Sequence, residues 1–225
     1  MAPTEDTPKT SAPSAAAPAT AAAETFFTPQ RLRVLGYVAA AALVIAAGAW
    51  FMVTANQRKE QYASRALDEA RNAAEQGNIG LAVQGFTKVV SSYKGTAGAY
   101  EASLGIAQAR LVSGQNELAI ASLTDFLKTN PPAFYAAPAN GLLGTAYENT
   151  GRWNDALAAH RKAADLAGVE YLKASALLDA GRAARLGGKR DEAIAIYREI
   201  LTKHGKTAAE TEAKIRLAEL TGGQP

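Results

Sequence analysis

The chain has 225 residues, of which 48% are hydrophobic and 20% charged, and its net charge is +3. Basic and acidic residues are interspersed, so the sequence lacks the basic stripe that nucleic-acid binding requires. It contains no cysteine, which excludes disulfides, thiolate metal sites and cysteine nucleophiles.

The first thirty residues form an Ala/Pro/Thr-rich tail. Twenty-two of them are alanine, proline, threonine or serine, and five of the nine prolines lie there. Such a segment has few large apolar side chains to offset the entropy lost on ordering. We therefore predict that residues 1–30 are disordered, which leaves room for one folded domain in the rest of the chain.

A stretch of 22 residues without charge, VLGYVAAAALVIAAGAWFMVTA, follows at residues 34–55. As an α-helix it would be roughly 33 Å long, enough to cross a hydrocarbon core of about 30 Å. Basic residues flank it and aromatic residues lie towards both ends, as interfacial anchors do. The pattern predicts a single-pass membrane anchor over residues 31–56. The alternative is a cleaved signal peptide, but the apolar run is long for one and begins after a long tail.

The segment also bears on the orientation of the anchor and on its packing in the membrane. Basic residues lie on both sides, so charge leaves the sidedness of the anchor open. Gly36, Ala40 and Ala47 are small residues that share one face of the helix, which predicts a surface for close packing against another membrane helix.

The remaining sequence, residues 57–221, repeats with a period of 37. Four segments align on a glycine, with a small residue seven positions earlier, an alanine five positions later and a larger residue nine positions later. These four columns are Gly77, Gly114, Gly151 and Gly188; Ala70, Ala107, Gly144 and Gly181; Ala82, Ala119, Ala156 and Ala193; and Phe86, Leu123, His160 and Tyr197. Four coincident columns over equal periods predict four helical hairpins.

Each column has a physical role. Small residues let two antiparallel helices approach closely, and the larger residue fills the space towards the next unit. The glycine ends the first helix in a left-handed conformation. Polar residues shortly after the glycine are expected to cap the second helix; they are Asn78, Asn116, Asn154 and Asp191.

The period places the units near residues 63–94, 95–131, 132–168 and 169–205, with the adjacent prolines Pro131 and Pro132 between the second and the third. A capping helix over residues 206–221 closes the stack. Its apolar positions are expected to lie on the fourth unit; they are Ala209, Ala213, Ile215, Leu217 and Leu220.

The third and fourth units resemble the tetratricopeptide repeat. The residues that carry the resemblance are Leu143, Gly144, Tyr147, Gly151, Ala156 and Ala163 in the third unit, and Ala180, Gly181, Gly188, Ala193, Tyr197 and Ile200 in the fourth. The usual period of that family is shorter, which predicts slightly longer helices or loops here.

The architecture of the chain, with a tail, a single span and a repeat domain, resembles the YfgM-like family of ancillary Sec translocon subunits. Residues 98–123 also resemble the second-unit region of that family. That resemblance implies a protein of the bacterial inner membrane, with a cytoplasmic N-terminus and a periplasmic repeat domain. It also implies contacts with the translocon and with periplasmic chaperones. The long tail departs from the family's pattern.

The tetratricopeptide resemblance further implies a protein-binding groove lined by the first helix of each unit. The usual lining positions carry over to Leu67, Arg71, Leu104, Gln108, Thr145, Glu148, Asn149, Leu178, Arg182 and Arg185. The lysine and asparagine clamp for a C-terminal carboxylate is not reproduced. Arg182 and Arg185 could pair with an acidic segment or belong to a solvated helix face.

No chemistry-bearing motif competes with this interpretation. His160 occupies a column that Phe86, Leu123 and Tyr197 fill in the other units, so we predict that it packs between units rather than acting as a ligand or base. His204 is the only other histidine, which is too few for a histidine metal site. Catalytic and cofactor motifs are absent.

The sequence therefore predicts an all-α, non-enzymatic adaptor: a transmembrane helix followed by an α-solenoid of about four tetratricopeptide-like hairpins and a C-terminal cap. Its expected partners are translocon subunits, periplasmic chaperones or envelope proteins, with no nucleic acid, cofactor or small-molecule substrate. One alternative is a scaffold for envelope assembly or cell division. The other is an enzyme with an unrecognised groove site, which a close cluster of titratable groups in the groove would favour.

Overall fold

Helices account for the regular structure of the computed structural model, which describes residues 29–223. Within that range the chain forms α-helices and no strand, and short turns join them. The helices are α2 (Pro29–Glu75), α3 (Ile79–Ser92), α4 (Ala97–Val112), α5 (Asn116–Lys128), α6 (Ala133–Asn149), α7 (Trp153–Leu166), α8 (Glu170–Leu186), α9 (Arg190–Lys203) and α10 (Ala209–Thr221). The predicted tail falls outside the described residues except for its last two positions.

The described chain divides into two units, one ending at Ala55 and one beginning at Asn56. The first unit is the apolar part of α2, whose large side chains are exposed; Leu43 and Trp50 are each 71% accessible. By length and composition this helix could cross a membrane: its most apolar window has a mean hydropathy of 2.1 and is not buried by the rest of the chain.

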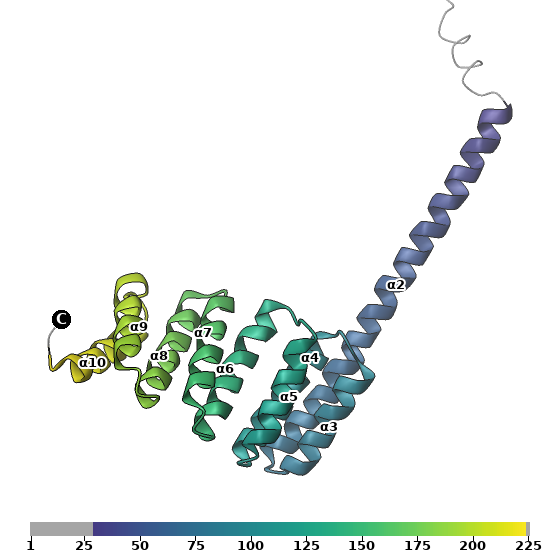
Figure 1. Cartoon of the computed structure of the whole chain (residues 1–225). Helices are drawn as coiled ribbons and strands as arrows, with labels where there is room; N and C mark the ends of the chain where they lie inside the picture. The colour runs from purple at the N-terminus through teal and green to yellow at the C-terminus, as the bar shows by residue number, and fades with distance from the viewer. Residues whose placement is uncertain (1–28, 224–225) are drawn as a thin grey trace, which may run out of the picture. The chain divides into compact units, whose positions relative to one another are not determined.

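The second unit consists of helical hairpins that stack in chain order (Figure 1). The end of α2 packs with α3, and α4 with α5, α6 with α7 and α8 with α9, while α10 covers α8 and α9. First helices of successive hairpins also touch, as α4 and α6 do. The predicted all-α solenoid with a terminal cap is thus confirmed. We call the surface formed by the first helix of each hairpin, together with the hollows that open on it, the groove face.

The turn glycines behave as the repeat predicts. Gly77, Gly114, Gly151 and Gly188 have φ values between +72° and +77°, the left-handed region that favours glycine. Each turn carries the same two hydrogen bonds, from the glycine N–H and from the N–H that follows it, to carbonyls of the preceding helix. In the third unit the N–H of Arg152 donates to the carbonyl of Tyr147 at 2.8 Å.

The predicted caps are wrong in three of the four units. Asn78 does cap α3, since its side chain accepts from the N–H of Leu81. Asn116, Asn154 and Asp191 instead lie inside the first turn of their helices. Each of these helices begins at the second residue after the turn glycine. The cause is the short glycine turn: it leaves a single residue before the next helix, so the polar residue arrives too late to cap it.

The small and large columns meet within one hairpin. An added Cβ at Gly144 would lie 2.5 Å from the His160 ring, and one at Gly181 would lie 2.6 Å from the Tyr197 ring. Both rings are 1% exposed. The larger residue therefore fills the gap to the small residue of its own unit, whereas the sequence predicted a filler towards the next unit. Phe86 follows the predicted direction, since its ring closes on Gly105 of the second unit.

Alanine dominates the core of the repeat domain. It supplies 23 of the 37 buried hydrophobic residues within the described part of the chain. In the cap, Ala209, Ala213 and Leu217 are buried, whereas Ile215 is 53% exposed, contrary to the expectation that it packs on the fourth unit. Residues 213 and 217 lie one turn apart, which places position 215 on the opposite side of the helix.

Replacing Gly151 with alanine is expected to destabilise the repeat domain by about 1–2 kcal/mol, the cost of a left-handed conformation for a residue with a Cβ. Urea unfolding followed by the helical circular dichroism signal measures this loss. Gly80→Ala is the matched control, because Gly80 lies in α3 at negative φ with open space around it. Equal midpoints for Gly151→Ala and Gly80→Ala would contradict the prediction.

Candidate protein-binding groove

All ten predicted groove residues lie on first helices. Leu67 and Arg71 belong to α2, and Leu104 and Gln108 to α4. The remaining six are Thr145, Glu148 and Asn149 on α6, and Leu178, Arg182 and Arg185 on α8. Their environments differ. Some line one of two hollows on the groove face, some belong to a charged cluster, and the rest do neither.

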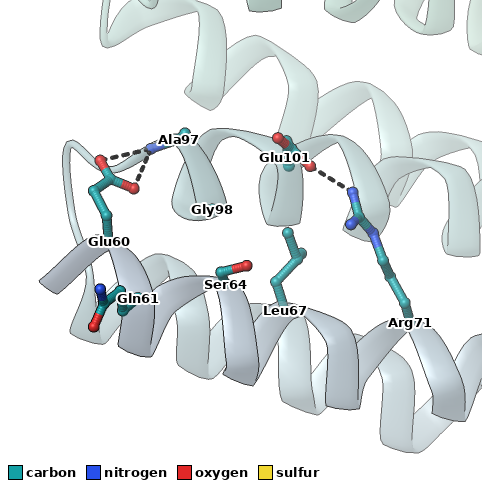
Figure 2. Close-up of a pocket in the computed structure, with 8 residues that line it drawn as sticks. All are labelled: Glu60, Gln61, Ser64, Leu67, Arg71, Ala97, Gly98 and Glu101. Carbon is teal, nitrogen blue, oxygen red and sulfur yellow. Dashed lines mark hydrogen bonds and ion pairs between the residues drawn. The ribbon is translucent and has the colours of Figure 1, made fainter. Parts of the chain in front are cut away.

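The first hollow, between α2 and α4, is shown in Figure 2 and has a volume of about 410 Å³. We call it the N-terminal hollow. Leu67 points across it towards α4 and is 4% exposed. At one end Glu60 accepts hydrogen bonds from the N–H of Ala97, at 3.1 and 3.2 Å, and so satisfies a free donor of the first turn of α4. At the other end Arg71 pairs with Glu101.

The second hollow lies between α4, the first half of α6, α7 and α8. Its volume is about 530 Å³ and its walls are mostly apolar, and we call it the central hollow. Leu104 lines it, together with Phe134, Pro138 and Leu172. Phe134 is 80% exposed and meets Tyr135 edge to face, with 5.1 Å between the ring centroids. The volume is within the range of about 300–1,000 Å³ typical of ligand pockets.

A charged cluster joins the third and fourth units beside the central hollow. Arg182 pairs with Asp179 at 2.7 Å on its own helix and with Glu148 of α6 at 3.1 Å. His160 Nε2 lies 3.3 Å from Glu148 Oε1. Burial raises the pKa of Glu148, but the contacts with His160 and Arg182 outweigh it and leave the pKa below its ordinary value.

The other predicted residues serve the scaffold or face solvent. Asn149 donates to the side-chain oxygen of Asn116 at 3.0 Å, and the Thr145 hydroxyl donates to the carbonyl of Gly141. Leu178 packs on the core of the fourth unit, and Gln108 is exposed. Arg185 Nε is buried and makes no hydrogen bond within the part of the chain that the structure describes.

Sequence reasoning missed residues one and two turns nearer the start of each first helix. The hollows use the column thirteen positions before the turn glycine, at Ser64, Glu101, Pro138 and Ser175. They also use the columns sixteen and seventeen positions before it, which include Phe134 and Tyr135. The signal was available for two of these columns, because a helix face recurs every three to four residues, and the columns thirteen and seventeen positions before the glycine share the face of Leu67 and Leu104.

Among residues 29–223, no group of three or more His, Cys, Asp or Glu side chains is placed to hold a metal ion. The charged cluster described above is the close group of titratable residues that would favour an enzyme. Both of its carboxylates are engaged by Arg182, and its histidine is 1% exposed. The cluster therefore links two repeat units through charge.

Comparison with known proteins supports the repeat assignment. Residues 175–207 match the family model of the tetratricopeptide repeat. A crystal structure of MamA is similar over 68% of this chain and 83% of its own, with a TM-score of 0.55 and 22% identity. A kinesin light chain with nearly identical tetratricopeptide-like repeats from Podosopora anserina is similar over 71% and 85%, with a TM-score of 0.57 and 15% identity.

A tetratricopeptide repeat protein from Parabacteroides merdae is similar over 72% of this chain and 61% of its own, with a TM-score of 0.56 and 14% identity. No curated protein matches the sequence. At these identities the likeness concerns the fold. The repeat domain is an α-solenoid of the tetratricopeptide type.

Proposed function

We propose that this chain is a membrane-anchored adaptor of the bacterial cell envelope that binds other proteins on its groove face. One observation carries the proposal: the repeat scaffold presents a mostly apolar hollow of about 530 Å³ on the face formed by its first helices. An enzyme is not proposed, because the carboxylates beside this hollow are already held in ion pairs.

The anchor in this proposal is the segment of α2 at residues 34–55. Its large apolar side chains are exposed along the whole segment, which would be costly in water and is favourable in a bilayer. The resemblance to ancillary translocon subunits supports a cytoplasmic N-terminus and a periplasmic repeat domain. A reporter enzyme that is active only outside the cytoplasm, fused after Pro225, is expected to be active in intact cells. Activity confined to a cytoplasmic reporter would overturn this topology.

The partners in this proposal are Sec translocon subunits and periplasmic chaperones. A photo-crosslinking residue at Gln108, which is exposed on the groove face, is expected to capture these proteins in native membranes. The same residue at Ala121, exposed on the second helix of that unit, is the control. Capture of cell-division or envelope-assembly proteins in place of translocon subunits would favour the scaffold alternative.

A second contact is proposed within the membrane, through Gly36, Ala40 and Ala47. Replacing Ala40 or Ala47 with leucine would hold a neighbouring helix further away. We expect these variants to co-purify less of the membrane partner after mild detergent extraction. Leucine at Ala41, which lies on another face of the helix, is the control. Unchanged recovery with both variants would remove this contact from the proposal.

A further inference from the structure

We propose that the central hollow receives a large apolar side chain from a partner segment that carries basic residues beside it. The inference rests on the proposed function, in that it assumes a protein partner, and adds the chemistry of the segment that is bound. The sequence had allowed an acidic partner segment, through Arg182 and Arg185. The arrangement of charges favours the opposite sign.

The apolar part of the argument comes from exposure. Phe134 and Leu172 line the central hollow and are 80% and 46% exposed, although smaller residues fill the core behind them. Gly141 also lines the hollow, and an added Cβ there would meet no atom within 4 Å, so the space beside it is open. An apolar side chain in this space would remove these surfaces from water.

One backbone carbonyl at the wall of the hollow lacks its helical hydrogen-bond donor. The buried His160 is not such a group, because its Nε2 faces Glu148 Oε1 at 3.3 Å. Pro138, on the wall, has no N–H, so the carbonyl of Phe134 lacks its helical donor. The backbone N–H of a bound peptide could donate a hydrogen bond to this carbonyl.

The charges around the hollow select the sign of the partner. Among the described residues that line it, Glu101 and Asp179 are charged at neutral pH and none is lysine or arginine. Carboxylates outnumber the arginines nearby, because Arg71 pairs with both Glu101 and Asp68, and Arg182 with both Asp179 and Glu148, so each group keeps one net negative charge. Burial and then the charges of Glu101 and Glu60 raise the pKa of Tyr135, which indicates a negative potential here. A basic residue beside the inserted side chain would be attracted.

Peptide binding to the full chain in phosphatidylcholine nanodiscs tests the inference. The probe is a fluorescein-labelled alanine-based peptide with a central phenylalanine flanked by lysines, and binding is read by fluorescence anisotropy. Changing the phenylalanine to alanine is expected to weaken binding about tenfold or more. Changing the lysines to glutamates is expected to weaken it several-fold, by an amount that shrinks as salt is raised.

Two variants locate the site. Gly141→Leu places a side chain in the open space and is expected to weaken binding of the lysine peptide about tenfold. Gly80→Leu is the matched control, because Gly80 is a helical glycine in equally open space outside the hollow. Glu101→Gln together with Asp179→Asn is expected to abolish the preference for lysine over glutamate. Circular dichroism confirms that each variant is folded.

Several outcomes would overturn the inference. Two of them are equal affinity for the lysine and glutamate peptides, and unchanged peptide binding by Gly141→Leu. A third is a change of oligomeric state in Gly141→Leu, measured by light scattering, because a second copy of the chain would then be the occupant of the hollow. If crosslinks from Gln108 persist while peptide selectivity fails, this inference alone is wrong. If Gln108 captures no protein, the proposed function is wrong as well.

Discussion

Replacing Gly181 with leucine is expected to lower the free energy of unfolding of the repeat domain by about 3 kcal/mol, the upper part of the range for overpacking a core. An added Cβ at this position would lie 2.6 and 2.7 Å from two atoms of the Tyr197 ring. Tyr197 is 1% exposed and belongs to the buried core of the fourth unit, so a shift of its ring would disturb that core. The loss is measured as a lower urea midpoint of the full chain in detergent.

Gly141→Leu is the control for this prediction, since Gly141 lies in the first helix of its own unit with open space around it. Its stability is expected to match or slightly exceed that of the original chain, because leucine favours helix over glycine by up to about 1 kcal/mol. A compensating pair adds a sharper test. Gly181→Ala with Tyr197→Leu copies the Ala107 and Leu123 pair of the second unit, and should recover stability relative to Gly181→Ala, because it removes the ring atoms next to the added Cβ. Equal midpoints for Gly181→Leu and Gly141→Leu would contradict the close approach.

Replacing Glu148 with glutamine is expected to cost about 1.5 kcal/mol at neutral pH, the lower end for a hydrogen bond to a charged group. The lower end of that free-energy range applies because Arg182 is 42% exposed and, in the variant, keeps its contact with Asp179. The loss should depend on pH. The pKa of Glu148 is lowered in the folded state, so its stabilisation is present above the unfolded pKa of about 4.3 and disappears as pH falls through the folded value.

The measurement is the difference in unfolding free energy between the original chain and Glu148→Gln across the acidic range. We expect this difference to be constant near neutral pH and to shrink once pH falls below about 4.3. Glu69→Gln is the control, because Glu69 is exposed on α2 and should give a small difference at every pH. A difference that grows on acidification would show that Glu148 is not stabilised as a carboxylate.

The repeat architecture could be predicted because its requirements are local and chemically narrow. A left-handed turn admits few residues other than glycine, so four glycines at equal spacing specify four turns. The first residue of each second helix was harder to predict. The short turn leaves only one residue between the glycine and the next helix, and the sequence does not show this length. Asn116, Asn154 and Asp191 resemble caps in sequence, yet only the length of the turn decides which residue occupies that position.

The environments of the groove residues were harder to predict, because they depend on contacts between repeat units. Columns carried over from the tetratricopeptide resemblance lie on the first helices, and three of the ten residues line the hollows: Leu67, Arg71 and Leu104. Arg182 looks available to a partner in sequence. In the structure it is held by Glu148, 34 residues earlier, and this pairing depends on how two units stack. Likewise His160 follows the packing column but keeps nitrogens that phenylalanine, leucine and tyrosine lack.

The alanine-rich core has a consequence for how the chain divides its side chains between inside and outside. An alanine has no rotamers to lose, so burying it carries little side-chain entropy cost, unlike burial of a larger flexible residue. Helices that approach over alanine can therefore fold together without committing many large apolar residues to the interior. Large apolar side chains such as Phe134, Tyr171 and Leu172 are thus left at the surface of the repeat domain, where a bound partner could cover them.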